Sequence, residues 1–266
     1  MNQVHDDFRA PNFQLSTDLN EALLAPACPA ERHSWEHLTA QATLVLPTNG
    51  CSIRSIITGR RIITTGVYAS RKSGRAHPYE SMNERAFFMH CEVDTNIVDY
   101  RAQPFRFEFV MDGTKRTYIA DAVALLADGS VEVIEIKNDS RFLKDPDYQL
   151  KLSAVADICS QVGWSFRIFL REALYTPTTR WQAIEDIQSW AFTAYTTADV
   201  FQVAQYLYRR GSRELGEVAD CLGRRALGIA KLKAMMVARI VDIDLSKPLN
   251  NQTRVTLITD GMGELV

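Results

Sequence analysis

The chain has 266 residues and a mass of 30.0 kDa, with 46% hydrophobic and 23% charged residues. These values are ordinary for a globular protein with a sizeable core, and they predict one or two domains. The formal net charge of −2 excludes a protein that coats nucleic acid by bulk positive charge. Any contact with nucleic acid must therefore come from local basic patches.

The five cysteines are scattered along the chain and form no C-x-x-C pair. An odd number of isolated cysteines favours reduced thiols over a disulfide or zinc framework. The first residues, MNQVHDDFRA, contain no apolar signal segment, and no later run has the length that a membrane span requires. We therefore expect a soluble, cytoplasmic protein that does not contact a membrane.

Residues 1–53 mix proline, aspartate and short apolar stretches without a sustained period, which predicts an N-terminal arm or peripheral layer. The following segment, 54–75, groups basic residues around β-branched pairs and glycines, as in a strand-and-loop region. Its basic side chains either contact DNA phosphates beside the site described below or belong to a solvated loop. They are Arg60, Arg61, Arg71, Lys72 and Arg75.

A central domain is predicted over residues 54–176. Its first helix begins near Ser81, a suitable N-cap, and Glu84 follows three residues later, as in a capping box. Strand-like stretches follow at 96–100, 105–111, 117–126 and 131–137, and two Asp-Gly turns predict that the last three form an antiparallel meander. A helix over 148–162, ending at Gly163, and the strand SFRIFLREA complete an α/β fold with a central sheet.

Pro177 marks a domain boundary, because the sequence beyond it is helical almost to its end. Three helices followed by two short β-branched runs are typical of a winged-helix domain, which we place at 177–266. Basic residues are concentrated on the last of these helices, which therefore contacts either DNA or a protein partner. They are Arg224, Arg225, Lys231 and Lys233.

The segment DAVALLADGSVEVIEIK carries the most informative pattern of the chain. Glu135 and Lys137 are two residues apart on a predicted strand, so their side chains share one face. Asp121, on the adjoining strand, can approach them across the hairpin. Two carboxylates supply the oxygen ligands that Mg²⁺ prefers, and an ammonium can act on the attacking water or the scissile phosphate. The pattern therefore predicts a metal-dependent phosphodiesterase site.

The apolar surroundings of this strand strengthen the prediction. A glutamate and a lysine among valines and isoleucines are costly to bury unless they are paired or bound to metal. The carbonyl of Ile136 is a further candidate ligand, and Glu84 in the preceding helix adds a third carboxylate. The alternative is a salt bridge on an edge strand, because an isolated E-x-K is common. The combination with Asp121 and Glu84 favours the nuclease site.

The runs HPYESMNERAFFMHCEVDTNIVDYRAQPFRFEF and RTYIADAVALLADGSVEVIEIK resemble the TnsA-type endonuclease subunit of heteromeric, Tn7-like transposases. The pattern of that family is an "ES..E" helix followed by a "QP" strand, a "Y.PD" strand and an "E.K" strand. The resemblance covers residues 60–174 or so, and the tail containing DIDLSKPL is similar to the family's winged-helix domain. The chain departs from the pattern at Ala120, where proline is usual, and at Glu135, where at least one member has glutamine.

The resemblance implies an α/β restriction-endonuclease-like core, a mixed sheet flanked by helices, with Glu84, Asp121, Glu135 and Lys137 as the catalytic set. It implies that Glu84, Asp121, Glu135 and Ile136 bind Mg²⁺, or Mn²⁺ in its place, with two ions expected. The implied task is cleavage of the non-transferred strand of double-stranded DNA at transposon ends. The implied partners are an integrase-like transposase subunit and an ATPase that regulates target selection. The alternatives are a stand-alone restriction or repair nuclease and a catalytically idle DNA-binding adaptor.

Overall fold

The structure is a computed structural model and is described for residues 19–25, 42–47, 52–53 and 64–259. The chain divides into two compact units. The core unit comprises the described residues up to Cys91 together with Asn96–Thr176, and the C-terminal unit comprises Glu92–Thr95 and the residues from Pro177 onward. Within the described ranges, no helix combines the length and apolar character needed to span a lipid bilayer.

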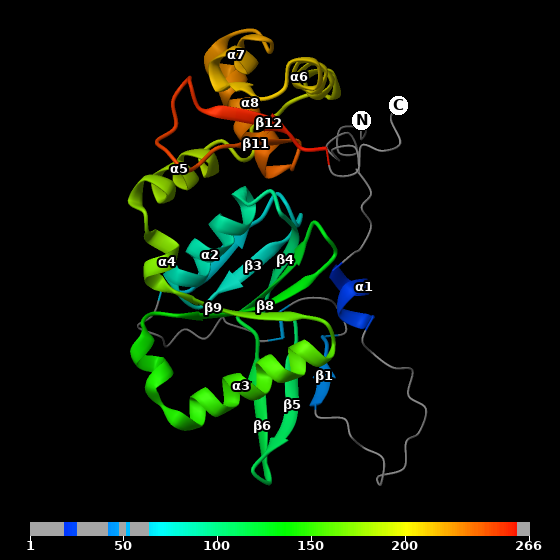
Figure 1. Cartoon of the computed structure of the whole chain (residues 1–266), viewed down its shortest axis with the longest axis vertical. Helices are drawn as coiled ribbons and strands as arrows, with labels where there is room; N and C mark the ends of the chain where they lie inside the picture. The colour runs from blue at the N-terminus through cyan, green and yellow to red at the C-terminus, as the bar shows by residue number, and fades with distance from the viewer. Residues whose placement is uncertain (1–18, 26–41, 48–51, 54–63, 260–266) are drawn as a thin grey trace, which may run out of the picture. The chain divides into compact units, whose positions relative to one another are not determined.

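A mixed sheet of four strands, in the order β4-β7-β8-β9, forms the centre of the core unit (Figure 1). Strands β4, β7 and β8 are antiparallel neighbours, whereas β9 is parallel to β8. Helix α3 connects the two parallel strands, because a parallel pair requires a crossover. The bounds are β4 Ile97–Ala102, β7 Ala122–Leu126, β8 Val131–Lys137, α3 Pro146–Gln161 and β9 Ser165–Leu170.

Two smaller sheets accompany the central one. The first has the order β1-β5-β6, and the second is the β2-β3 hairpin. Their strands are β1 Ala42–Val45, β2 Gly66–Ala69, β3 Ala76–Tyr79, β5 Arg106–Met111 and β6 Thr114–Ile119.

The predicted meander is wrong in one respect, because the strand expected over 117–126 is interrupted at Ala120–Asp121. Strands β5 and β6 therefore pair in one sheet, and β7 and β8 pair in another. Backbone hydrogen bonds join Asp121 to both neighbouring segments. Gln103 N, just after β4, donates to Asp121 O at 3.1 Å, and Asp121 N donates to Ile134 O of β8 at 3.1 Å. Asp121 thus stands at the junction of two sheets.

Helix α2, Met82–Val93, and helix α3 lie on opposite sides of β8 and β9 (Figure 1). Successive residues of a strand face opposite sides of a sheet, and β9 shows both contacts. The ring of Phe169 lies 5.0 Å from that of Phe87 in α2, whereas Ile168 packs against the cluster that contains Leu152 of α3. The central sheet is therefore covered on both faces.

The described part of 1–53 belongs to the core unit. Helix α1, Leu19–Leu24, places Leu19 and Leu23 in the buried cluster, because residues four apart share one face of a helix. Strand β1 pairs antiparallel with β5. A second difference is that the chain becomes helical after Leu170, as α4, Arg171–Tyr175, where a strand was expected. A 3-10 turn, Ser140–Lys144, precedes α3.

The described C-terminal unit contains four helices and a small sheet of order β10-β12-β11. The helices and the antiparallel pair β11-β12 follow the predicted order, although the N-cap of α6 is Thr196 rather than Thr197. The assignment as a winged-helix domain stays a prediction. The bounds are α5 Thr178–Gln188, α6 Thr197–Arg210, β10 Arg213–Glu214, α7 Leu215–Asp220, α8 Arg225–Val237, β11 Val241–Ile243 and β12 Arg254–Leu257.

Helices α7 and α8 approach each other closely at Gly228. A Cβ atom at this position would lie 2.2 Å from the carbonyl oxygen of Ala219, so the contact requires glycine. Most of α8 beyond this point is buried, including Leu232 and Met235. Helix α8 is therefore mainly a core helix of its unit.

Candidate active site

Asp121 directly precedes β7 and adjoins Glu135 of β8. The register pairs Ala122 with Ile134, which brings Asp121 to this part of β8, and the charge of Glu135 acts on the Asp121 carboxylate. The backbone N–H of Ile136 donates to Asp121 Oδ2 at 2.7 Å, and Glu135 is only 3% exposed. The hairpin therefore holds two carboxylates together in the interior of the core unit.

Lys137 is two residues beyond Glu135 on the same strand and points to the same face. Its Nζ lies 2.5 Å from Glu135 Oε1. Burial lowers the pKa of Lys137, but the carboxylates of Glu135 and Asp121 raise it by more, so the pKa lies above its ordinary value. At neutral pH the side chain is therefore an ammonium, which donates hydrogen bonds and accepts none.

When Asp121 and Glu135 are both ionised, their negative charge exceeds what Lys137 neutralises. Burial and, next, the carboxylate of Glu135 raise the pKa of Asp121 to about 8, against the opposing effects of Lys137 and the Ile136 N–H. Two buried carboxylates beside one ammonium are stabilised by a further positive charge. The electrostatics of the site therefore favour a bound cation.

Glu84 enters the site from the first turn of α2. Ser81 caps this helix, since Ser81 Oγ accepts from Glu84 N at 3.1 Å, as predicted. The Glu84 carboxylate accepts from Ser81 Oγ at 3.0 Å and from Glu80 N at 2.8 Å. Burial raises the pKa of Glu84, and these hydrogen bonds oppose the increase. The charge of Glu84 acts on both Asp121 and Lys137, so all four predicted catalytic residues belong to one electrostatically coupled group.

The chemistry of the donor set fits a hard divalent cation at Asp121 and Glu135, because both supply carboxylate oxygens. No described residue donates a hydrogen bond to the second oxygen of Asp121, Oδ1. Over the described ranges, no three His, Cys, Asp or Glu side chains are grouped so as to hold a metal ion. A cation at the two carboxylates therefore needs other oxygen ligands, for which the Ile136 carbonyl, water and a DNA phosphate are available.

Sequence reasoning missed two tyrosines that contact Glu135. Tyr118 Oη donates to Glu135 Oε2 at 2.7 Å, and Tyr148 Oη donates to Oε1 at 2.5 Å. Tyr118 is the tyrosine of the "Y.PD" pattern, so that pattern was a usable signal. Tyr148 lies in α3, and no spacing or periodicity marks it.

Gln103, from the "QP" pattern, supports the backbone of Asp121. It is 2% exposed and has a left-handed backbone with φ of 43°, which is uncommon for a residue other than glycine. Its side chain donates to Glu80 Oε1 at 3.4 Å and accepts from Ser52 Oγ at 3.2 Å. Gln103 thus connects the junction at Asp121 with the residue that precedes the cap of α2.

The structure describes part of the predicted basic loop, near the C-terminal end of α2. Arg60 and Arg61 lie outside the described residues, and Arg71, Lys72 and Arg75 lie in the turn between β2 and β3. Lys72 Nζ donates to the carbonyl of Cys91 at 2.6 Å, near the C-terminal end of α2. Cys91 is seven residues beyond Glu84, or about 10 Å along a helix. The turn therefore lies at the opposite end of α2 from Glu84.

The basic residues of the C-terminal unit have different surroundings. Lys231 Nζ is 2.8 Å from Asp199 Oδ1, and Lys233 Nζ is 2.7 Å from Asp186 Oδ1, with Lys233 buried. These ion pairs join α8 to α6 and to α5. The ammonium groups of Lys231 and Lys233 are engaged inside the unit, whereas Arg224 and Arg225 lie at the exposed start of α8. Arg225 also pairs with Asp220 there. DNA contact by these four basic residues stays a prediction.

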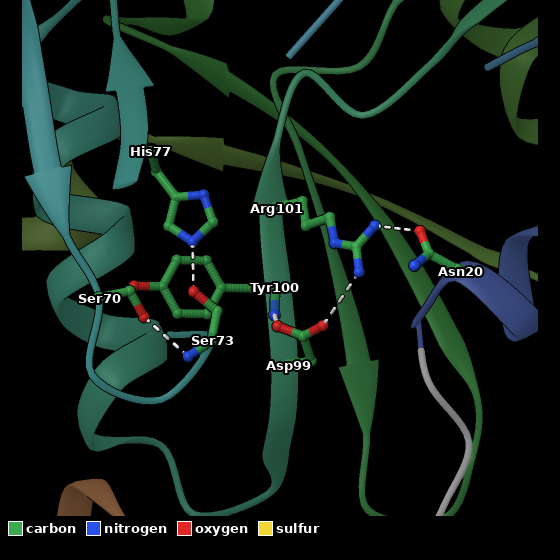
Figure 2. A network of polar contacts seen from close by, with 7 residues as sticks. All are labelled: Asn20, Ser70, Ser73, His77, Asp99, Tyr100 and Arg101. Atoms are coloured by element: carbon green, nitrogen blue, oxygen red, sulfur yellow. Dashed lines mark hydrogen bonds and ion pairs between the residues drawn. The ribbon is translucent and has the colours of Figure 1, made fainter. Parts of the chain in front are cut away.

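A second buried polar cluster surrounds His77 of β3 (Figure 2). Its ring lies 4.7 Å from that of Tyr100, and its Nε2 is 2.7 Å from Ser73 Oγ. Arg101, in the adjoining network, contacts Asp99 at 3.7 Å and Asn20 of α1. Burial and then the positive charges of Arg101 and Arg75 lower the pKa of His77 to about 4. His77 is therefore a neutral packing residue at physiological pH.

We expect His77 to make the stability of the core unit depend on pH. Its pKa is 6.5 in the unfolded chain and about 4 in the folded one, so its contribution is complete above pH 6.5. As the pH falls from 6.5 to 4 the unfolded state binds the proton first, and stability decreases by about 3 kcal/mol at most. The free energy of unfolding, measured in urea across this range, should fall less steeply in His77→Phe, which keeps the ring and cannot titrate. Parallel pH curves for the two proteins would contradict this role.

The comparison with known families agrees with this geometry. Residues 94–171 match the family model described as TnsA-like endonuclease N terminal, a range that contains β4 to β9 with Asp121, Glu135 and Lys137. No curated protein matches the chain. The mixed sheet with its flanking helices fits a restriction-endonuclease-like fold. The chain therefore contains a domain that matches the TnsA-like endonuclease family, which confirms the resemblance predicted from its sequence.

Proposed function

We propose that this chain is a Mg²⁺-dependent DNA endonuclease subunit of a transposase, which cuts the non-transferred strand at transposon ends. The observation that carries the proposal is the close approach of Asp121 and Glu135 at the β7-β8 hairpin, beside the ammonium of Lys137. This group lies within the range that matches the endonuclease family. A carboxylate pair and a protonated lysine are suited to hydrolysis of a phosphodiester.

Each residue of the site has a role in this proposal. Asp121 and Glu135 would hold Mg²⁺ or Mn²⁺, with the Ile136 carbonyl and Glu84 as further ligands of a site for two ions. The bound metal supplies a more acidic water and neutralises charge on the phosphate. Lys137 donates to a phosphate oxygen or to the attacking water.

The proposed hydrolysis is a single in-line displacement at phosphorus. The oxygen of water forms a bond to phosphorus while the P–O3′ bond breaks. The attacking water loses one proton to solvent, and the leaving O3′ takes one proton from solvent. The products are a 3′-hydroxyl and a 5′-phosphate.

The proposed partners follow from the family resemblance. An integrase-like subunit would perform strand joining, and an ATPase would select the target. The C-terminal unit, in which α6, α7 and α8 precede the β11-β12 pair, is proposed to be a winged-helix domain that contacts DNA or one of these proteins. Arg224 and Arg225 are its candidate DNA contacts.

The test is a cleavage assay with the full chain on a plasmid that carries the element's ends. The chain is assayed alone and together with the co-purified products of neighbouring genes, in Mg²⁺ or in EDTA. We expect nicks at the ends, with 3′-hydroxyl termini, only when Mg²⁺ and the partners are both present. Specific cutting by the chain alone would identify a stand-alone nuclease. Absence of cutting in the complete mixture would favour an idle adaptor.

A further inference from the structure

Three donors surround the carboxylate of Glu135. Tyr118 Oη donates to Oε2 at 2.7 Å, whereas Tyr148 Oη and Lys137 Nζ both lie 2.5 Å from Oε1. A carboxylate has about four lone-pair sites, two on each oxygen. Tyr148 and Lys137 together therefore fill Oε1, and one lone pair remains on Oε2.

Asp121 shows the same division of its two oxygens. Its Oδ2 accepts from the N–H of Ile136, and no described residue donates to Oδ1. Each carboxylate thus has one oxygen committed to protein donors and free acceptor capacity on the other. This pattern is typical of metal ligands whose orientation is fixed by surrounding hydrogen bonds.

Tyr148 differs from Tyr118 in its position. Tyr118 is 3% exposed and lies close to the hairpin in the chain, three residues before Asp121. Tyr148 is half-buried and comes from α3, the helix that covers this face of the sheet. Lys137 Nζ lies 5.4 Å from the centre of the Tyr148 ring, so this one side chain contacts both Glu135 and Lys137.

We propose that Tyr148 is a positioning residue, which fills Oε1 of Glu135 together with Lys137 and so leaves Oε2 as the oxygen that binds the cation. This inference rests on the proposed function, because it assumes that Glu135 is a metal ligand. Without the hydroxyl, the Glu135 carboxylate can rotate, and a metal ion must fix its orientation on binding. Loss of the hydroxyl therefore weakens metal binding more than it slows the chemical step.

The test compares Tyr148→Phe with wild type by calorimetric titration of Mn²⁺ in the absence of DNA. Removal of such an orienting hydrogen bond typically weakens metal affinity 10- to 100-fold. We expect a shift of about tenfold in the dissociation constant. Cleavage assays, with the partner proteins present, should show a higher Mn²⁺ requirement and a near-wild-type rate at saturating Mn²⁺. The matched control is Tyr208→Phe, which removes a hydroxyl from a 74% exposed tyrosine of α6.

Thermal unfolding in EDTA verifies that Tyr148→Phe is folded, as expected for a change that keeps the ring. Wild-type affinity for Mn²⁺ in Tyr148→Phe would overturn the inference and leave the proposed function intact. Unchanged affinity with a low rate at saturating Mn²⁺ would also overturn it, since the hydroxyl would then act on the reaction itself. A wild-type protein that binds no Mn²⁺ would instead refute the proposed function.

Discussion

Asp121→Asn should abolish Mg²⁺-dependent cleavage and at the same time stabilise the metal-free protein. The amide keeps the size of the side chain and can still accept from the Ile136 N–H, so the hairpin is preserved. The substitution removes a charged oxygen ligand for a hard cation, however, and a neutral amide is a poor replacement for a carboxylate. Activity and stability are therefore expected to change in opposite directions.

The stability effect follows from the pKa of Asp121, which is 3.8 in the unfolded chain and about 8 in the folded one. The folded state binds a proton more tightly, so this group favours folding below pH 3.8, and that benefit disappears as the pH rises towards 8. Asparagine cannot ionise and lacks this dependence. In EDTA, the melting temperature of Asp121→Asn should therefore exceed that of wild type at pH 7, and the difference should vanish near pH 4.

The control is Asp128→Asn, which alters an exposed aspartate in the turn of the same β7-β8 hairpin. It should cut DNA like wild type, because Asp128 is exposed and accepts hydrogen bonds from Ser130 within the turn. Plasmid nicking at the wild-type rate by Asp121→Asn would show that Asp121 is not a metal ligand. A lower melting temperature at pH 7 would show that its charge is not a burden in the metal-free fold.

Lys137→Ala should retain Mn²⁺ binding and lose cleavage by about 10²- to 10³-fold, the cost usually seen when one charge-stabilising donor is removed. The ammonium has donors only and cannot bind a cation. Its loss removes a positive charge beside Glu135, which favours metal binding, and also one of the two donors to Oε1, which opposes it, so metal affinity should change little. Calorimetric titration beside single-turnover nicking at saturating metal measures the two quantities separately.

The matched control for Lys137 is Lys115→Ala, in which an exposed lysine of β6 is removed from the same unit. The Mn²⁺ affinity and the nicking rate of Lys115→Ala should equal those of wild type. Normal cutting by Lys137→Ala would exclude a role in transition-state stabilisation. Loss of metal binding would show instead that the lysine is needed to hold Glu135 in place.

The sequence by itself determined the centre of the site, because that centre depends on residues close together in the chain. Strand alternation places Glu135 and Lys137 on one face of β8, and an Asp-Gly turn is enough to bring Asp121 near them. The cap at Ser81 likewise depends on a side chain that reaches only three residues, to Glu84. The match to the endonuclease family, over residues 94–171, includes the hairpin with Asp121, Glu135 and Lys137.

Only the tertiary structure decided which distant residues meet these local elements. The break at Ala120–Asp121 arises because β5-β6 and β7-β8 join different sheets, a choice that the uniform strand pattern of 117–126 does not contain. Tyr148 reaches Glu135 because α3 packs on that face, and Lys72 binds the far end of α2. Lys233 meets Asp186 through the packing of α8. Such contacts depend on how whole elements pack, and neither the spacing nor the charge of the residues in the chain specifies that packing.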